Sequence, residues 1–131
     1  MTNSNSGALL AEFADQVGPN LIATGIVTDS GKLECYIVKN QDGKKYDVER
    51  SASIFAMIVN IFNVTLAEIY EKKEEVDEVL VTTESNYFLV RIIQPRNLWH
   101  GITFKKDTDI HLIRQLMKHY KFLFLSTSSQ I

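Results

Sequence analysis

SASIFAMIVNIFNVTLAEIYEKK, the stretch from Ser51 to Lys73, decides the fold, because its apolar residues fall on more than one face of the helix that it predicts. One stripe at helical spacing is formed by Ile54, Ile58, Ile61 and Phe62. A second stripe beside it is formed by Phe55, Val59, Leu66, Ile69 and Tyr70, with Met57 and Val64 on the flanks. A helix on a protein surface needs only one apolar stripe, so this helix should be covered on two sides. A sheet of the same chain can cover one side and a further partner the other; the alternative is a helix deep in a monomeric core.

Length, composition and charge limit the class of protein. A chain of 131 residues suits one domain, and contents of 45% hydrophobic and 23% charged residues exclude wholesale disorder. The net charge of -2 leaves no basic excess to neutralise phosphates, so we expect protein partners and no nucleic acid. Cys35 is the only cysteine, and the segment from Met1 to Gly7 lacks the apolar core of a signal peptide. These features predict a cytoplasmic protein.

Asn60 and Asn63 interrupt the apolar run of the central helix. No uninterrupted stretch therefore approaches the roughly 18 apolar residues that suggest a membrane span. We expect no direct insertion into a membrane.

Apolar periodicity and turn residues divide the rest of the chain into short elements. We expect a helix at 8–17, strands at 21–28 and 33–39, the central helix at 51–73, strands at 77–83, 86–93 and 98–105, and a final helix capped by Asp107 or Thr108. The connections between the last three strands are too short for a crossover, so these strands form an antiparallel meander. The order α-β-β-α-β-β-β-α predicts an α+β fold, a five-stranded antiparallel sheet with helices on its faces. One domain should span 8–125, with flexible ends at 1–7 and 126–131.

Local signals predict how several elements end and pack. Ser51 is the expected N-cap of the central helix, with Asp47 as the alternative. Lys72 and Lys73 are expected in its last turn, where Glu68 can pair with Lys72.

Two strands carry signals of their own. Gly25 in the first strand suggests the close approach of a packed element. The strand at 86–93 should direct one set of side chains to one face and a second set to the other. These sets are Phe88, Val90 and Ile92, and Tyr87, Leu89, Arg91 and Ile93.

Side chains capable of chemistry are scattered. His111 and His119 share a predicted helix but are too far apart to act as adjacent metal ligands, and His100 belongs to a strand. Cys35 is expected to be a small buried hydrophobe, and no glycine-rich loop matches a phosphate-binding pattern. Four arginines could each be imagined as an arginine finger on a bound GTPase, although a surface or sheet-edge arginine is favoured for each: Arg50, Arg91, Arg96 and Arg114. We expect no catalytic residue, no cofactor and no metal.

From about Leu10 to Phe124 the chain resembles the roadblock/dynein light chain family. The order and spacing of four segments carry the resemblance: ATGIVTDSG at 23–31, SASIFAMIV at 51–59, YFLVR at 87–91, and KKD at 105–107 leading to IHLIR at 110–114. The family's first hairpin turn is closer to Asp-Gly, whereas Ser30 is inserted here, and the second loop is long.

The resemblance implies a fold similar to profilin and longin domains, with the third strand at an edge of the sheet. Family members form homodimers or heterodimers in which central helices pack together and edge strands join into one sheet. Such a dimer would satisfy the second apolar face of the helix and protect the open strand edge. The implied interface residues are Ile54, Met57, Ile58, Ile61, Val79, Leu80 and Val81.

The resemblance also implies a class of function. Family members are adaptors in dynein complexes, scaffolds that recruit small GTPases on membranes and, in bacteria, partners or activators of Ras-like polarity GTPases. We therefore expect a dimeric protein–protein interaction module that regulates or scaffolds a Ras-like small GTPase or a motor or signalling complex. Its first partner would be a second copy or a paralogous roadblock subunit. Partner-binding residues are expected at the start of the central helix and in the preceding loop: Asp42, Lys44, Lys45, Tyr46 and Arg50.

The alternative is a small-ligand sensor domain of similar profilin- or PAS-like α+β outline. Such a domain needs an internal cavity. Bulky side chains would tend to fill it, namely Phe55, Phe62, Phe88, Phe104 and Tyr120.

Overall fold

The computed structural model describes residues 3–39, 46–95 and 97–128 of the chain. Its helices are α1 (Asn3–Val17), α2 (Val48–Tyr70) and α3 (Ile110–Ser128). Its strands are β1 (Leu21–Thr28), β2 (Leu33–Val38), β3 (Glu78–Thr82), β4 (Asn86–Gln94) and β5 (Leu98–Lys105). The predicted α-β-β-α-β-β-β-α order is confirmed.

The five strands form one antiparallel sheet in the order β2-β1-β5-β4-β3. The predicted β3-β4-β5 meander is present, and β3 lies at an edge, as the roadblock resemblance implies. The hairpin of β1 and β2 joins the meander through the antiparallel pairing of β1 with β5.

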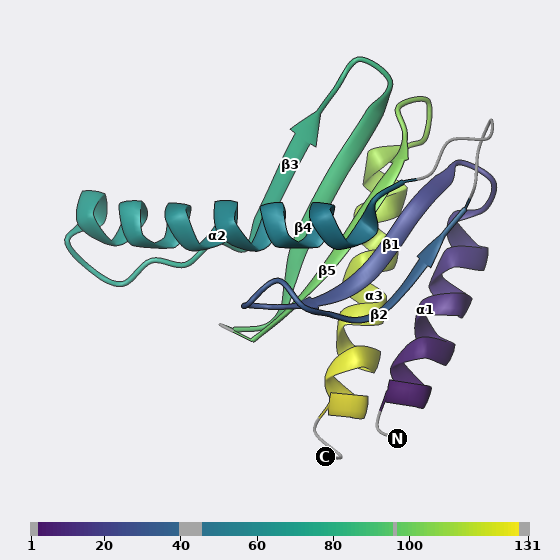
Figure 1. The fold of residues 1–131 in the computed structure, drawn as a ribbon, viewed down its shortest axis with the longest axis horizontal. Helices are drawn as coiled ribbons and strands as arrows, with labels where there is room; N and C mark the ends of the chain where they lie inside the picture. Colours follow the sequence, from purple (N-terminus) through teal and green to yellow (C-terminus); the bar gives the residue numbers. More distant parts are fainter. Residues whose placement is uncertain (1–2, 40–45, 96, 129–131) are drawn as a thin grey trace.

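Helices cover both faces of the sheet (Figure 1). The helices α1 and α3 lie side by side on one face, and α2 crosses the other, its C-terminal half extending beyond β3. The larger core lies between the sheet and α1 and α3, around Phe13, Phe104 and Phe124. A smaller core beneath α2 contains Val59, Val90 and Trp99.

The alternation along β4 follows the prediction. Val90 and Ile92 belong to the core beneath α2, while Leu89 and Ile93 belong to the core beneath α1 and α3. Because successive side chains of a strand point to opposite faces, these four positions fix which face each neighbouring residue occupies.

The two terminal helices are longer than predicted. The helix α1 begins at Asn3, so residues 3–7 are helical, and α3 continues to Ser128, so residues 126–128 are helical too. Ser6 is buried, and its hydroxyl lies 3.3 Å from that of Thr127. The polar composition of the two ends predicts loose tails. The contact that orders them joins residues far apart in the chain, which local composition does not reveal.

The two ends of α2 also differ from the prediction. Asp47 is the N-cap, and its Oδ1 accepts a hydrogen bond from the Arg50 backbone N–H at 3.1 Å. Ser51 lies within the helix, so its predicted capping role is wrong. The helix ends at Tyr70, and Glu71 adopts the left-handed conformation with φ 55°. Lys72 therefore lies past the helix and not in its last turn.

Candidate interaction surface

The face of α2 that points away from the sheet is apolar and exposed. Met57 and Ile61 expose 56% and 57% of their surfaces. The other large apolar residues exposed on this helix are Ile54, Phe62, Val64, Ile69 and Tyr70. At about 100° per residue, Ile54, Met57, Ile61 and Val64 lie on this face, and we call these four residues the α2 stripe. Phe62, Ile69 and Tyr70 lie on other sides of the C-terminal half of the helix, which extends beyond β3. Nothing in the described chain covers the α2 stripe, so the helix is not enclosed within a monomeric core.

The face of α2 that packs on the sheet is built around small residues. Ala52, Ala56 and Val59 are buried. Phe55 and Leu66 are half-buried against the same core, as expected if the second predicted stripe faces the sheet. Ile69 and Tyr70, which were assigned to that stripe, are exposed instead. The alanines decide which side of α2 faces the sheet, because their small side chains let the helix approach it closely. The spacing of the large apolar residues alone does not reveal this side.

The two asparagines of α2 anchor the helix to neighbouring segments. Asn63 Oδ1 accepts a 2.6 Å hydrogen bond from the backbone N–H of Val76, in the connection that leads to β3. Asn60 Nδ2 donates to the carbonyl oxygen of Asp29 at 3.2 Å. By length and composition alone, α2 is the one helix of the described residues that could cross a membrane. These hydrogen bonds and the buried alanines place it on the sheet.

Apolar side chains are also exposed on the edge strand β3. Leu80 and Val81 each expose 38% of their surfaces. Val79 is half-buried against the core beneath α2, and Ile58 is half-buried on the helix. Of the seven predicted interface residues, five are therefore exposed in the single chain, while Val79 and Ile58 contribute part of their surface to the fold.

Charged side chains fix the same edge strand to α3. The Glu78 carboxylate accepts hydrogen bonds from Arg91 Nη1 at 2.8 Å, and from Arg114 Nε and Nη2 at 3.1 and 2.9 Å. A weaker ion pair joins Arg91 to exposed Asp77 at 3.5 Å. Arg91 and Arg114 are thus occupied within the chain, and this network orients β3 by bidentate, charge-assisted bonds.

The predicted partner-binding residues lie in different environments. Arg50 is exposed in the first turn of α2. Tyr46 is half-buried, its ring stacks on Phe88, and its hydroxyl hydrogen-bonds with Ser51 and Thr103. Three further candidates, Asp42, Lys44 and Lys45, lie outside the described residues, as does Arg96.

The histidines do not come together. His111 and His119 are exposed on α3, whereas His100 is buried on β5 between the rings of Phe13 and Phe124. Burial lowers the pKa of His100 to about 3, which keeps the ring neutral. Among the described residues, no group of three or more His, Cys, Asp or Glu side chains could hold a metal ion.

Cys35 is half-buried on β2, where the sequence predicted a buried hydrophobe. Burial raises the pKa of its thiol to about 11, with a smaller effect of the Glu34 carboxylate. A thiol that stays protonated at neutral pH is a poor nucleophile.

Solved structures of other proteins share this fold, in which a helix crosses one face of the sheet. A gliding protein MglB from Thermus thermophilus superimposes with a TM-score of 0.84 at 11% identity, covering 99% of this chain and 93% of that one. A roadblock/LC7 domain from Streptomyces avermitilis superimposes with a TM-score of 0.72 at 12% identity, over 93% of this chain and 99% of that one. This chain has the roadblock fold.

Other roadblock-fold structures agree. MglB from Myxococcus xanthus superimposes with a TM-score of 0.78 at 17% identity, over 95% of this chain and 91% of that one. An MglB with a tetrameric arrangement is also similar, with a TM-score of 0.84 at 11% identity, over 98% of this chain and 91% of that one. Comparison of the sequence with protein-family models and with curated proteins finds no match. At these identities, the roadblock likeness concerns the fold.

Proposed function

We propose that this protein is a cytoplasmic dimeric interaction module that binds a Ras-like small GTPase or a larger protein assembly and has no catalytic residues of its own. The dimer would be a homodimer, or a heterodimer with a paralogous roadblock subunit. The observation that carries the proposal is the α2 stripe together with the apolar edge strand beside it.

The spacing of the α2 stripe suits a helix–helix seam. Ile54, Met57, Ile61 and Val64 follow one another at intervals of three, four and three residues. This is the spacing at which apolar side chains of two helices interdigitate. A two-fold dimer would use the stripe twice, since the same patch of both subunits meets at a two-fold axis.

The edge strand supports the same arrangement. The outer side of β3 has no strand partner in the sheet, and its exposed Leu80 and Val81 would add apolar contacts to a second strand. Unpaired, apolar strand edges favour association with another chain. Pairing of β3 with its copy would remove this edge while the two α2 helices cover each other.

A GTPase partner is what the sequence resemblance to the roadblock family implies, and the likeness to solved roadblock-fold structures supports the fold that this resemblance implies. The binding surface would be composite, because a dimer presents paired helices that neither subunit presents alone. Exposed Arg50 lies at the start of α2 and is our candidate contact residue.

The dimer is tested first. Light scattering at micromolar concentration should give about twice the mass of one chain. Ile61→Asp should yield a folded monomer, because Ile61 is already 57% exposed in the single chain and only the interface buries the new charge. Phe122→Asp is the matched control, since Phe122 is 70% exposed on α3, on the opposite face of the sheet. A wild-type monomer, or an Ile61→Asp dimer as stable as wild type, would remove the proposed interface.

The partner is tested next. The purified protein is added to Ras-like GTPases of its host, and both binding and GTP hydrolysis are measured. Arg50→Ala should weaken binding, whereas Lys118→Ala, which changes an exposed cation on α3, should not. Turnover of GTP by this protein alone would contradict the absence of catalytic residues, and failure to bind any GTPase would leave the larger assembly as the partner to be isolated.

A further inference from the structure

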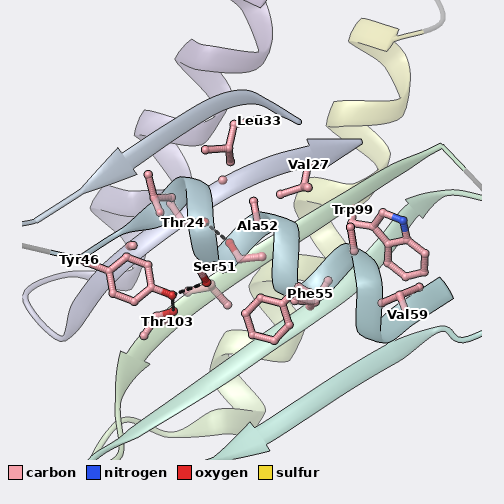
Figure 2. Close-up of a pocket in the computed structure, with 17 residues that line it drawn as sticks. Thr24, Val27, Leu33, Tyr46, Ser51, Ala52, Phe55, Val59, Trp99 and Thr103 are labelled. Atoms are coloured by element: carbon pink, nitrogen blue, oxygen red, sulfur yellow. Dashed lines mark hydrogen bonds between the residues drawn. The ribbon is translucent and has the colours of Figure 1, made fainter. Parts of the chain in front are cut away.

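A hollow lies between α2 and the sheet, on the side of the helix opposite the α2 stripe (Figure 2). We call it the α2 pocket. The centres of water molecules can occupy a volume of about 40 Å³ in this pocket, so the pocket has room for about three waters. Of the aromatic residues that were expected to fill such a cavity, Phe55 lines the pocket and leaves it open. Phe62 is exposed, while Phe104 and Tyr120 belong to the core on the other face.

The absence of a side chain at Gly101 leaves part of this space open. Gly25 of β1 and Gly101 of β5 pair directly and both line the pocket, beneath Ala52 and Ala56 of α2. A Cβ atom added at Gly101 would meet only Val90 Cγ2, at 3.7 Å. Glycine in the interior of a strand weakens the strand, and it commonly marks a site where a ligand or another backbone comes close. Within the described residues, no backbone atom beyond those of Gly101 and its two chain neighbours lies within 4 Å of a Cβ placed at Gly101.

The lining determines what could bind. None of the described residues that line the pocket carries a charge, and most of the surface that they form is apolar. The exception is one end, where Figure 2 shows Tyr46, Ser51 and Thr103 grouped together. The Tyr46 hydroxyl oxygen lies 2.7 Å from that of Ser51 and 2.9 Å from that of Thr103. Three hydroxyls supply three donors, and these two hydrogen bonds use two of them, so one O–H and several lone pairs remain for a ligand.

We propose that the α2 pocket binds a small, neutral organic molecule with a short apolar body and one oxygen, such as a short-chain ketone or alcohol. Its oxygen would accept a hydrogen bond from the one remaining O–H, which lies on Thr103 when Ser51 donates to Tyr46 and Tyr46 donates to Thr103. Its carbon atoms would lie over Gly101 against Val90 and Phe55. We expect a neutral ligand, because no lining residue in the described part of the chain could pair with a charge. The site is separate from the proposed dimer interface, which uses the opposite face of α2, so each proposal can fail alone.

The first test uses 2-butanone as the probe and the full chain. Titration should shift the amide NMR signals of Gly25, Gly101 and Thr103, and these shifts should saturate at millimolar concentration, as the few ligand atoms allow. Butylammonium, which has a similar apolar body but carries a charge, should leave the signals unchanged. Absence of saturating shifts with 2-butanone would overturn the proposal. If these amide signals changed only when a protein partner was added, the pocket would instead receive a side chain of that partner, and the proposal would be wrong.

Two variants locate the site. Gly101→Ala adds a methyl group where there is space for one and should weaken 2-butanone binding at least tenfold. Gly7→Ala is the matched control, because a Cβ at Gly7 of α1 meets nothing within 4 Å. Thr103→Val keeps the shape of the side chain and removes its hydroxyl, so it should weaken binding of 2-butanone but not of isobutane, which has no oxygen. Undiminished 2-butanone binding by Gly101→Ala would place the ligand elsewhere and contradict the proposal.

Discussion

Gly25 of β1 and Gly101 of β5 face each other across one pair of antiparallel strands, yet only one of the two positions has room for a side chain. A Cβ at Gly25 would lie 3.1 Å from Leu33 Cδ2 and 3.2 Å from the Cys35 carbonyl oxygen. The approach that the sequence predicted at Gly25 is therefore that of the neighbouring strand β2. Gly101 instead faces the α2 pocket.

The two glycines should respond oppositely to alanine. Gly25→Ala should lower the free energy of unfolding by about 1–3 kcal/mol, because the backbone carbonyl of Cys35 cannot move away without disturbing the β1–β2 pairing. Gly101→Ala should raise it by about 0.5–1 kcal/mol, since alanine restricts the unfolded chain and fits without a clash. Urea denaturation of the two variants provides the measurement. Equal destabilisation by both changes would show that the space above Gly101 is not available.

The element order and the strand faces could be predicted from this sequence because they depend on local period and turn chemistry. The inward side of α2 could not, since Ala52 and Ala56 carry too little apolar surface to stand out beside Ile54 and Met57. Ser51 and Asp47 are both good caps, and only the backbone geometry decides between them. The α2 pocket depends on the register that places Gly25 opposite Gly101, and sequence periodicity does not give the register between β1 and β5.

The buried His100 should make stability depend on pH. Folded His100 stays neutral down to a pKa of about 3, while in the unfolded chain its pKa is close to 6.5. Between these values the unfolded state binds more protons, so this contribution to stability is complete above about pH 6.5 and is lost as the pH falls towards 3. The slope should reach about 1.4 kcal/mol per pH unit. Protonation would also place an N–H at Nδ1, which has no hydrogen-bond partner among the described residues, while Nε2 lies 3.0 Å from Thr24 Oγ1.

Urea denaturation between about pH 7 and pH 5 measures this slope, above the range in which most carboxylates titrate. His100→Gln should flatten it, because glutamine does not titrate. His119→Gln removes an exposed histidine of α3 and should leave the slope unchanged. An unaltered slope in His100→Gln would assign the pH dependence to other groups.

The Glu78 carboxylate should stabilise the attachment of the edge strand to α3. Glu78→Gln keeps the size of the side chain but removes the charge that Arg91 and Arg114 share, and should cost about 1–2 kcal/mol. Asp77→Asn is the neighbouring control. The Asp77 carboxylate is exposed and lies 3.5 Å from Arg91, so this change should lower the free energy of unfolding by less than about 0.5 kcal/mol. Thermal unfolding of both variants makes the comparison. Equal losses would mean that the network on Glu78 adds no more than an ordinary surface ion pair.

The two asparagines of α2 should differ in what they contribute, although in the sequence both only interrupt an apolar run. Asn63→Ala removes the acceptor of the Val76 backbone N–H, and because Val76 is buried, this donor would be left without a partner. The expected loss of stability is about 1–3 kcal/mol. Asn60→Ala breaks an exposed hydrogen bond to the Asp29 carbonyl, which water can replace, and should cost about 0.5 kcal/mol. Hydrogen exchange separates a local effect from a general one, since the Val76 amide should lose protection in Asn63→Ala well beyond the change in the amides of β5. If Val76 stayed as protected as in wild type, the connection from α2 to β3 would be held by its apolar contacts and not by Asn63.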